Sequence, residues 1–357
     1  MAIKGLILSG GKGTRLRPIT HTRAKQLVPV AGKPVLFYGI EAMRDAGITE
    51  IGIIVGDTEA EIRAGVGDGS RFGVEITYLP QSAPLGLAHA VLTAEEFIGD
   101  SSFCMYLGDN LLRDGVRDFV DAFQAGSAEA MILLQPVDDP QSYGIAELDE
   151  HGRVQRLVEK PKEPRSNLAL VGCYLFRTSI FEQSRKLEPS WRGELEITDA
   201  IQGLVDAGYE VETHIVHGWW KDTGRLDDIL EANRLILDTV ERSIAGTYGD
   251  DVRIDGRVVI EPGVKLERCH VRGPVVIGAD ASITDAYIGP YTAISHDVEI
   301  SNAEIEHSII LEHAKIVDLG ARVEDSLIGE AAVVTRSRLR PAAHRLMIGD
   351  GSRIEVL

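Results

Sequence analysis

A glycine-rich stretch near the N-terminus concentrates groups that could bind phosphate. Residues 8–17 read LSGGKGTRLR and follow directly after an apolar run, residues 3–8. Glycine lets backbone N–H groups approach phosphate oxygens closely, and lysine and arginine neutralise phosphate charge. The stretch is not GxGxxG, nor is it a Walker A loop, because Gly11-Lys12 is followed by Gly13 rather than by serine or threonine. The pattern therefore predicts an anion site of another kind.

Two aspartates at predicted strand ends are candidate metal ligands. Asp109 follows the apolar run 102–107, and Asp222 follows the sequence WWK. Carboxylates together with substrate phosphates are the usual way in which proteins hold Mg²⁺. A single aspartate after a strand is more often a turn former or a helix cap. Each aspartate alone is therefore a weak signal for a metal site.

The elements that must position these residues alternate between strand and helix along the first part of the chain. Strands are predicted over 3–8, 50–55, 74–79, 102–107 and 130–137, and helices over 34–46, 58–66, 86–98 and 115–125. This order predicts an α/β fold, a doubly wound and mostly parallel sheet with helices on both faces. Ligands of such sheets bind at the carboxyl ends of the strands, where the glycine-rich stretch and Asp109 are expected.

The alternation loosens after residue 140. Residues 146–161 predict a hairpin that turns at His151-Gly152, because alternating apolar residues flank a turn pair. Further elements are a strand over 170–176, a helix over 196–208, a strand over 211–224 with a polar end, and an amphipathic helix over 225–240.

From about residue 250 a six-residue repeat replaces helical spacing. An aliphatic residue is followed four positions later by a small or β-branched residue and two positions later by another aliphatic residue. The triplets are Ile260/Val264/Leu266, Ile277/Ala281/Ile283, Ile288/Thr292/Ile294, Ile294/Val298/Ile300, Ile310/Ala314/Ile316 and Ile328/Ala332/Val334, and the quartets IEPG, IGAD, IGPY and IGEA place turn residues right after the leading aliphatic residue. This period predicts a hexapeptide-repeat β-helix of four or five coils, which share one continuous core. We expect a catalytic domain over residues 1–240 and the β-helix over residues 250–345.

Composition narrows the class of protein. The 357 residues suffice for two domains, and 44% hydrophobic with 26% charged residues is ordinary for a soluble globular protein. A net charge of −18 argues against nucleic acid as a partner. With neither a signal peptide nor an apolar run long enough to cross a membrane, we expect a cytoplasmic protein without a membrane partner. Cys104, Cys173 and Cys269 lack zinc-site spacing and are expected to be reduced and buried.

Eight sequence blocks carry a resemblance to a known family. They are LSGGKGTRLRPIT, KQLVPVAGKPV, GLAHAV, YLGDN, YGIAELD, EKP, GELEITDAI and WWKDTG, in this order. The chain resembles the sugar-1-phosphate nucleotidyltransferases, and among them the glucose-1-phosphate thymidylyltransferases. The repeat region and its closing GDGSRIEV are similar to a long-form subgroup frequent in antibiotic deoxysugar pathways. The resemblance implies a Rossmann-like (GT-A-like) domain, a left-handed parallel β-helix, and formation of dTDP-glucose and pyrophosphate from dTTP and glucose 1-phosphate with Mg²⁺.

The resemblance also implies roles for individual residues. The reaction joins two anions, so catalysis must come from positioning and positive charge. Catalytic roles are implied for Arg15, Lys25, Asp109 and Asp222, with Asp109 and Asp222 as metal ligands. Nucleotide contacts are implied for Leu8, Gly10, Gly11, Gly13, Thr14, Arg15, Gln26, Gln81, Pro84, Gly86 and Asp109. Sugar-phosphate contacts are implied for Tyr143, Gly144, Glu159, Lys160, Val171, Glu196 and Trp220. Trp220 equally fits core packing, and Gly86 an ordinary loop before a helix.

Three alternatives remain open. A UTP- or GTP-using nucleotidyltransferase would share the fold, and uracil differs from thymine only by a methyl group. A bifunctional enzyme would add sugar acyl transfer in the β-helix, where His270, His296, His307 and His313 are available without an accompanying motif. A regulatory protein without turnover is disfavoured because the phosphate loop and both aspartates are present. We expect a homo-oligomer through the flat coil faces, the catalytic domain, or both.

Overall fold

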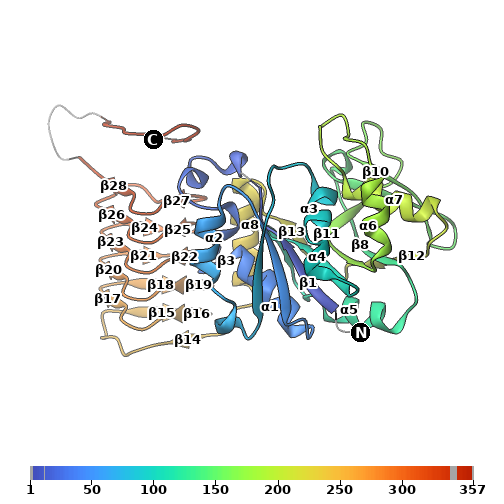
Figure 1. Ribbon diagram of the computed structural model, residues 1–357. Helices are drawn as coiled ribbons and strands as arrows, with labels where there is room; N and C mark the ends of the chain where they lie inside the picture. Colours follow the sequence, from blue (N-terminus) through green and yellow to red (C-terminus); the bar gives the residue numbers. More distant parts are fainter. Residues whose placement is uncertain (1–2, 12, 338–343, 356–357) are drawn as a thin grey trace. The chain divides into compact units, whose positions relative to one another are not determined.

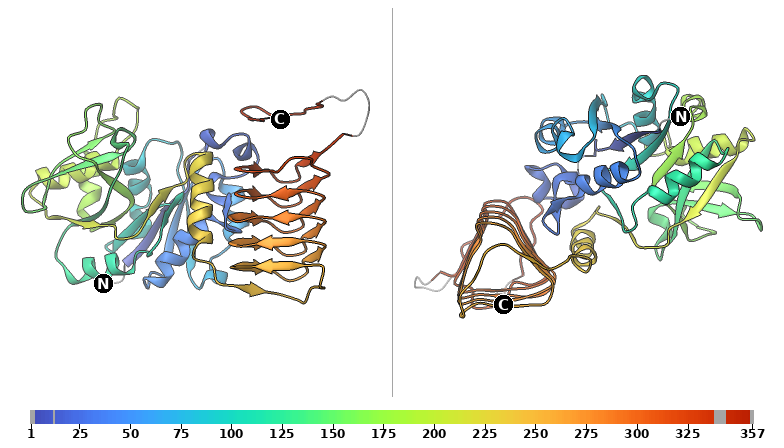
Figure 2. Two further views of the ribbon diagram at one scale, coloured as in Figure 1. Left: turned by 180° about the vertical axis from the view of Figure 1, so that it is seen from behind. Right: turned by 90° about the horizontal axis from the view of Figure 1, so that it is seen from below.

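A computed structural model describes residues 3–11, 13–337 and 344–355 (Figures 1 and 2). The chain divides into two compact units. The sheet unit comprises Met1–Lys12, Ala24–Leu27 and Val35–Asp222, and the β-helix unit comprises Gly13–Arg23, Val28–Pro34 and Thr223–Leu357. Each unit is described by itself. The predicted domain limits, 1–240 and 250–345, stay predictions, and residues 338–343 lie outside the described part of the chain.

A mostly parallel sheet organises the sheet unit, as predicted. Its main path runs β10-β9-β11-β6-β1-β4-β5; β8 branches from β11, and β12 pairs with β8. The strands are β1 (Ile3–Leu8), β4 (Glu50–Val55), β5 (Glu75–Pro80), β6 (Ser102–Leu107), β8 (Ala130–Pro136), β9 (Gly144–Leu148), β10 (Val154–Glu159), β11 (Leu168–Phe176) and β12 (Val211–Ile215). Strands β6, β1, β4 and β5 are parallel, whereas β11 runs antiparallel to β6 and β8.

Helices cover both faces of this sheet (Figure 1). They are α1 (Val35–Asp45), α2 (Glu59–Val66), α3 (Leu87–Thr93), α4 (Glu95–Ile98), α5 (Arg117–Ala125), α6 (Ser179–Arg185) and α7 (Ile197–Asp206). Side chains alternate across β1, so Leu6 packs in one buried cluster with α3, α4, α6 and α7, and Ile7 in another with α1, α2 and α5. The doubly wound arrangement is therefore confirmed.

Two predicted elements were wrong in extent. The helix predicted over 86–98 is two helices, α3 and α4, which meet at Ala94. The strand predicted over 211–224 is interrupted at 216–219, and its second part is β13 (Trp220–Asp222). β13 pairs antiparallel with β7 (Asn110–Leu112), a strand that the sequence did not predict because three residues carry too little alternation.

Three parallel sheets form the β-helix unit, so the predicted parallel β-helix is confirmed. One sheet contains β14 (Ser243–Ile244), β16 (Val258–Ile260), β19 (Val275–Ile277), β22 (Thr292–Ile294), β25 (Ile309–Ile310) and β27 (Leu327–Ile328). The second contains β15 (Arg253–Asp255), β18 (His270–Arg272), β21 (Tyr287–Ile288) and β24 (Glu304–Ile305). The third contains β17 (Lys265–Glu267), β20 (Ser282–Thr284), β23 (Glu299–Ser301), β26 (Lys315–Val317) and β28 (Val333–Thr335). The end-on view in Figure 2 shows the triangular coils, whose interior holds the aliphatic residues.

Some coils are shorter than a strict six-residue period predicts. Ile277 pairs with Ile294, Ile294 with Ile310, and Ile310 with Ile328. One coil therefore takes 17, 16 or 18 residues, whereas three six-residue sides would always take 18. Left-handed backbone at the corners accounts for the tight turns. It falls on the last residue of each predicted turn quartet, namely Gly263, Asp280, Tyr291 and Ala331.

Helix α8 (Leu226–Leu237) also belongs to the β-helix unit. Its buried Asn233 donates from Nδ2 to the carbonyl oxygen of Tyr291 at 2.9 Å. The Oδ1 atom of the same side chain accepts from the backbone N–H of Ala31 at 2.8 Å, which connects the helix to the hairpin of β2 (Pro29–Val30) and β3 (Lys33–Pro34).

The three cysteines are buried and free, as predicted. Among the described residues, no helix has the length and apolar character needed to span a membrane.

Candidate functional site

The first part of the glycine-rich stretch lies at the carboxyl ends of neighbouring parallel strands. The N–H of Gly108 donates to the Leu8 carbonyl, and the N–H of Ser9 to the Ile54 carbonyl, both at 2.9 Å. A Cβ built at Gly10 would lie 3.5 Å from Oε1 of Gln81, and one at Gly11 would lie 3.9 Å from Nε2 of Gln26. The structure thus brings together four residues that the sequence assigned to the nucleotide.

Gly86 must be glycine because of a close contact with a distant part of the backbone, which the sequence did not reveal. Its φ is +105°, and a Cβ there would lie only 2.4 Å from the carbonyl oxygen of Leu195. This backbone contact joins the block GLAHAV to the block GELEITDAI. Gln81 approaches the same turn, with its Nε2 atom 3.4 Å from the Gly86 carbonyl oxygen and 2.9 Å from Nδ1 of His89. The predicted base-contacting residues therefore form one connected turn, in which Pro84 is exposed.

The short β7–β13 ladder brings the two candidate metal ligands together. Asp109 immediately precedes β7, and Asp222 ends β13 directly opposite Asn110. The buried Lys25 ammonium forms an ion pair with Asp109, whose Oδ1 atom accepts from Asn110 Nδ2 at 2.9 Å. Burial raises the pKa of Asp109, but the Lys25 ammonium outweighs it, so the pKa lies below its ordinary value. Asp109 is therefore held as a carboxylate at neutral pH.

Asn110 supports this site, and sequence reasoning missed it although it lies in the block YLGDN. Its side chain is buried, and its Oδ1 atom accepts a hydrogen bond from Nε1 of Trp220. Its carbonyl oxygen accepts from the hydroxyl of Tyr106 at 2.9 Å. Trp220 also packs edge-on against Tyr143, with ring centroids 5.3 Å apart. The tryptophan therefore joins the aspartate ladder to the start of the β9–β10 hairpin.

The β9–β10 hairpin places Gly144 opposite Glu159, both predicted sugar contacts. The hydroxyl of Thr198, on α7, donates to Oε2 of Glu159 at 2.7 Å. A Cβ at Gly144 would lie 2.8 Å from that hydroxyl, so the close approach requires glycine. Lys160 follows with a φ of 43°, and its N–H donates to the Tyr143 carbonyl at 3.0 Å. Burial is the main cause that raises the pKa of Glu159, and the nearby Glu196 raises it further.

Arg192 is a second residue that sequence reasoning missed. Its guanidinium lies 3.5 Å from Glu159, 3.1 Å from Glu194 and 3.3 Å from Glu196. Glu196 is buried and accepts from the Ser190 hydroxyl at 2.8 Å. The only sequence signal was the position of Arg192 directly before GELEITDAI. Arg192 joins that block to the EKP block, which supplies Glu159 and Lys160.

Val171 lies in an irregular part of β11, where the register with β8 shifts between Leu170 and Tyr174. The whole residue, backbone included, is fully buried. Beside it, a Cβ at Gly172 would lie 2.7 Å from Oδ1 of Asn110.

Three further predicted residues, Gly13, Thr14 and Arg15, belong to the β-helix unit, and the side chains of Thr14 and Arg15 are exposed.

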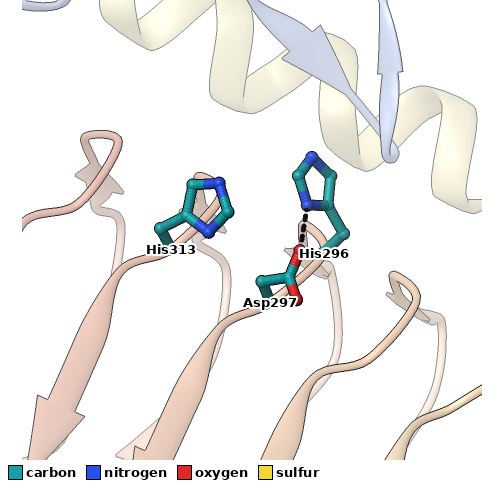
Figure 3. Close-up of side chains that lie close together, drawn as sticks. All are labelled: His296, Asp297 and His313. Atoms are coloured by element: carbon teal, nitrogen blue, oxygen red, sulfur yellow. Dashed lines mark hydrogen bonds and ion pairs between the residues drawn. The ribbon is translucent and has the colours of Figure 1, made fainter.

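The β-helix histidines have structural explanations. His296, Asp297 and His313 offer possible ligand atoms within 4.8 Å of one another, and Figure 3 shows His296 bonded to Asp297. All three are exposed, and that bond joins Nδ1 to Oδ2 at 2.8 Å. Asp297, His307 and His313 have φ values of 55°, 47° and 60°. Aspartate and histidine are among the residues that adopt this left-handed backbone most readily, so corner geometry accounts for them.

Comparison with known proteins gives consistent results. Residues 4–239 match the family model described as nucleotidyl transferase. The chain is 51% identical over 355 residues, 99% of each chain, to a glucose-1-phosphate thymidylyltransferase of Streptomyces antibioticus. It is 49% identical over 358 residues, 99% of this chain and all of the other, to the low-salt glycan biosynthesis nucleotidyltransferase Agl11 of Haloferax volcanii. A crystal structure from Bacillus anthracis, provisionally named a glucose-1-phosphate thymidylyltransferase, superposes with a TM-score of 0.63 and 36% identity, covering 69% of this chain and 98% of that one.

Proposed function

Because the chain belongs to the nucleotidyl transferase family, we propose that it forms dTDP-glucose and pyrophosphate from dTTP and glucose 1-phosphate. The full-length identity to a thymidylyltransferase favours thymidine as the base and glucose as the sugar. One structural observation carries the chemistry: the β7–β13 ladder sets Asp222 beside Asp109, which is itself paired with the buried Lys25.

Asp109 and Asp222 suit Mg²⁺, because both are hard carboxylate ligands, Asp222 lies opposite the residue that follows Asp109, and Asp109 is held in its charged form. When bound, the metal neutralises phosphate charge and helps to orient the substrates. Lys25 adds a positive charge at the same place. The positive charge of the resulting site counteracts the repulsion between the two reacting anions, which is the main difficulty of the reaction.

The nucleophile is an oxygen of the glucose 1-phosphate group. A new bond forms between this oxygen and the α-phosphorus of dTTP, and the bond from that phosphorus to the oxygen bridging to the β-phosphate breaks. The electron pair leaves on pyrophosphate. Because the attacking oxygen already carries negative charge, the step needs no general base. Backbone N–H groups of Gly10 and Gly11 bind the triphosphate, and Gly13, Thr14 and the Arg15 guanidinium continue the same loop.

Recognition of base and sugar falls to two other groups of residues. Gln81 pairs with the pyrimidine edge, and Leu8, Gln26, Pro84 and Gly86 surround the nucleotide. The sugar phosphate contacts Lys160, and Glu159 accepts hydrogen bonds from sugar hydroxyls. Tyr143, Gly144, Val171, Glu196 and Trp220 complete the sugar site.

Nucleotide competition tests this proposal. Glucose 1-phosphate is incubated with Mg²⁺ and equal concentrations of dTTP and UTP, and the sugar nucleotides are separated by chromatography. We expect dTDP-glucose to dominate, although one methyl group contributes only about 1–3 kcal/mol to discrimination. Dominant UDP-glucose would reassign the base preference, and no turnover with either triphosphate would overturn the proposal.

Asp222→Asn tests the proposed metal site at the β7–β13 ladder. We expect kcat to fall about 10²–10³-fold, the usual cost of removing one electrostatic group from such a site. Asp118→Asn, which changes an exposed aspartate on α5, is the matched control and should leave kcat unchanged. The homo-oligomeric state, the cytoplasmic location and a role in antibiotic deoxysugar formation stay predictions.

A further inference from the structure

The second part of the signature stretch, residues 13–23, is a compact loop of the β-helix unit, which we call the Arg23 loop. It contains two short 3-10 helices, η1 (Thr14–Leu16) and η2 (Ile19–His21). The Gly13 carbonyl oxygen accepts from the Thr20 hydroxyl at 2.7 Å and from the Leu16 N–H at 3.0 Å. These bonds tie the beginning of the loop, where Thr14 and Arg15 lie, to its second turn.

Arg23 fastens the end of this loop to the β-helix. Its guanidinium forms ion pairs with Glu312 and, at 3.0 Å, with Glu330. The side chains of Arg23 and Glu312 are only 17% and 15% exposed, so this pair is shielded from solvent far better than an ordinary surface pair. Burial raises the pKa of Glu312, but the hydrogen bond and charge of Arg23, together with a backbone hydrogen bond and the nearby His296, outweigh it, and the pKa lies below its ordinary value.

The two glutamates occupy one position on successive coils. Backbone bonds from Asp280 to Pro262, Asp297 to Ala279, His313 to His296 and Ala331 to Glu312 define a column of residues that each precede a corner. This column reads Pro262, Ala279, His296, Glu312 and Glu330. Its acidic members therefore lie on the last two of these coils, where Arg23 bridges them.

Two glycines lie close to the middle of the loop. A Cβ built at Gly329 would lie 3.4 Å from Cδ1 of Ile19. At Gly351, where φ is +79°, a Cβ would lie 3.4 Å from Cβ of Arg17. Gly351 belongs to the closing GDGSRIEV sequence, to which the proposed reaction gives no other role. The loop is thus anchored at its end by Arg23, and its middle lies close to the last coils and the C-terminal segment.

We propose that Arg23 is a positioning residue, whose bridge to Glu312 and Glu330 holds the Arg23 loop in one conformation. The Thr20–Gly13 bond extends this restraint to the start of the loop. Thr14 and Arg15, to which the proposed function assigns triphosphate contacts, therefore keep a preset geometry. This inference rests on the proposed function. Misplacement of a catalytic group by about 1 Å costs up to about a hundredfold in rate.

Steady-state kinetics of Arg23→Gln, Glu312→Gln and the double variant test the role of Arg23. We expect kcat/KM for dTTP to fall about ten- to a hundredfold in both single variants, while KM for glucose 1-phosphate stays unchanged. The double variant should be no worse than Arg23→Gln alone, because Arg23→Gln already removes the ion pair with Glu312. Arg23→Lys should recover part of the loss, since it keeps the charge.

Arg322 supplies the matched control. It bridges two glutamates of the β-helix in the same way, with Glu304 at 3.0 Å and Glu306 at 2.7 Å, but it contacts β24 rather than the Arg23 loop. Arg322→Gln should leave kcat/KM for dTTP unchanged. Equal kinetic losses in Arg23→Gln and Arg322→Gln would reduce Arg23 to a general stabilising residue and overturn the proposal.

Hydrogen exchange separates this proposal from the proposed function. Exchange of the amides of residues 13–23 should be faster in Arg23→Gln than in the unchanged protein, and unaltered in Arg322→Gln. Faster exchange with unchanged kinetics would show that the anchor exists but does not position the reaction, which overturns the proposal. Absence of turnover with every triphosphate in the unchanged protein would instead overturn the proposed function and the role of Arg23 with it.

Discussion

The two units position their side chains in different ways. In the sheet unit each candidate functional residue has partners from distant and unrelated stretches, as Asp109 has in Lys25 and Asn110. In the β-helix unit a position recurs every 16–18 residues, so its neighbours above and below are its own counterparts. The first arrangement can build a specific site but tolerates little change. The second is redundant, and it becomes specific only where a non-repeating segment contacts it.

Lys25 and Arg23 show this difference within three residues of chain. Lys25 belongs to the sheet unit and pairs with the candidate metal ligand Asp109. Arg23 belongs to the β-helix unit and bridges two equivalent positions on successive coils. One cation lies in the proposed reaction site, and the other holds the loop that carries Thr14 and Arg15. Variants of the two residues should therefore differ in the size of their effect.

Lys25→Gln should have a larger effect than any change in the β-helix unit. We expect kcat/KM to fall about 10²–10³-fold, because the variant removes a charge from the phosphate site and leaves the Asp109 carboxylate buried beside a neutral partner. Kinetics with each substrate varied in turn provide the measurement. Lys186→Gln, which removes an exposed cation paired with Glu182 on α6, should have no effect. A loss no greater than that of Arg23→Gln would break the comparison between the two cations.

Gly86→Ala tests how little change the sheet unit tolerates. The new Cβ would lie 2.4 Å from the Leu195 carbonyl oxygen at a φ of +105°, so either α3 or the segment before α7 must move. We expect the free energy of unfolding to fall by about 2–3 kcal/mol. Denaturant titration measures this change. Gly47→Ala is the control, because φ is +82° there but no atom lies within 4 Å, and it should cost about 1 kcal/mol.

The sequence predicted most of the fold because its signals were local. The apolar runs 3–8, 50–55 and 102–107 became β1, β4 and β6 with the predicted bounds. The six-residue pattern identified the β-helix because each coil repeats the same requirement for an aliphatic residue inside. Its exact coil length could not be read, because the spacing of the left-handed corners varies, from five positions between Asp297 and Asn302 to seven between Asp318 and Asp325.

The parts that escaped prediction depend on long-range contacts. Asn110 and Arg192 support other candidate residues through distant contacts, Asn110 with Trp220, 110 positions away, and Arg192 with Glu159 in a separate block. Arg23 was overlooked because Glu312 and Glu330 are about 300 residues distant and resemble ordinary surface acids. No local pattern in the sequence indicates such long-range pairs. The residue roles themselves came from the family resemblance and stay predictions.

Glu159→Gln should separate function from stability in the sheet unit. The pKa of Glu159 is raised in the folded state from its ordinary 4.5, so the folded protein binds this proton more tightly than the unfolded chain does. Stability contributed by the protonated form is present at low pH and is lost as the pH rises through the folded-state pKa. The variant should therefore be more stable than the unchanged protein at pH 7 and similar to it below pH 4.5, while KM for glucose 1-phosphate rises about tenfold.

Glu182→Gln, which is the same chemical change, should alter the stability at neutral pH in the opposite direction. A hydrogen bond from Lys186 lowers the pKa of this exposed carboxyl, so its removal should slightly lower stability at neutral pH and matter less in acid. Thermal unfolding of both variants between pH 4 and pH 8 provides the measurement. Matching pH profiles for the two variants would contradict the account of Glu159 as a buried, functionally placed carboxylate.

The smallest effect is expected at a corner of the β-helix. His313 is exposed and has a φ of 60°, a backbone conformation that asparagine adopts readily and a β-branched residue resists. His313→Asn should change the free energy of unfolding by less than about 0.5 kcal/mol, whereas His313→Val should cost about 1–2 kcal/mol. Ala331, at φ 54° on the next coil, shows that a residue with a Cβ already occupies the equivalent corner. If His313→Val proved as costly as Gly86→Ala in the same denaturant titration, the corners would be as specific as the sheet unit, and the contrast between redundant coils and a singly specified site would not hold.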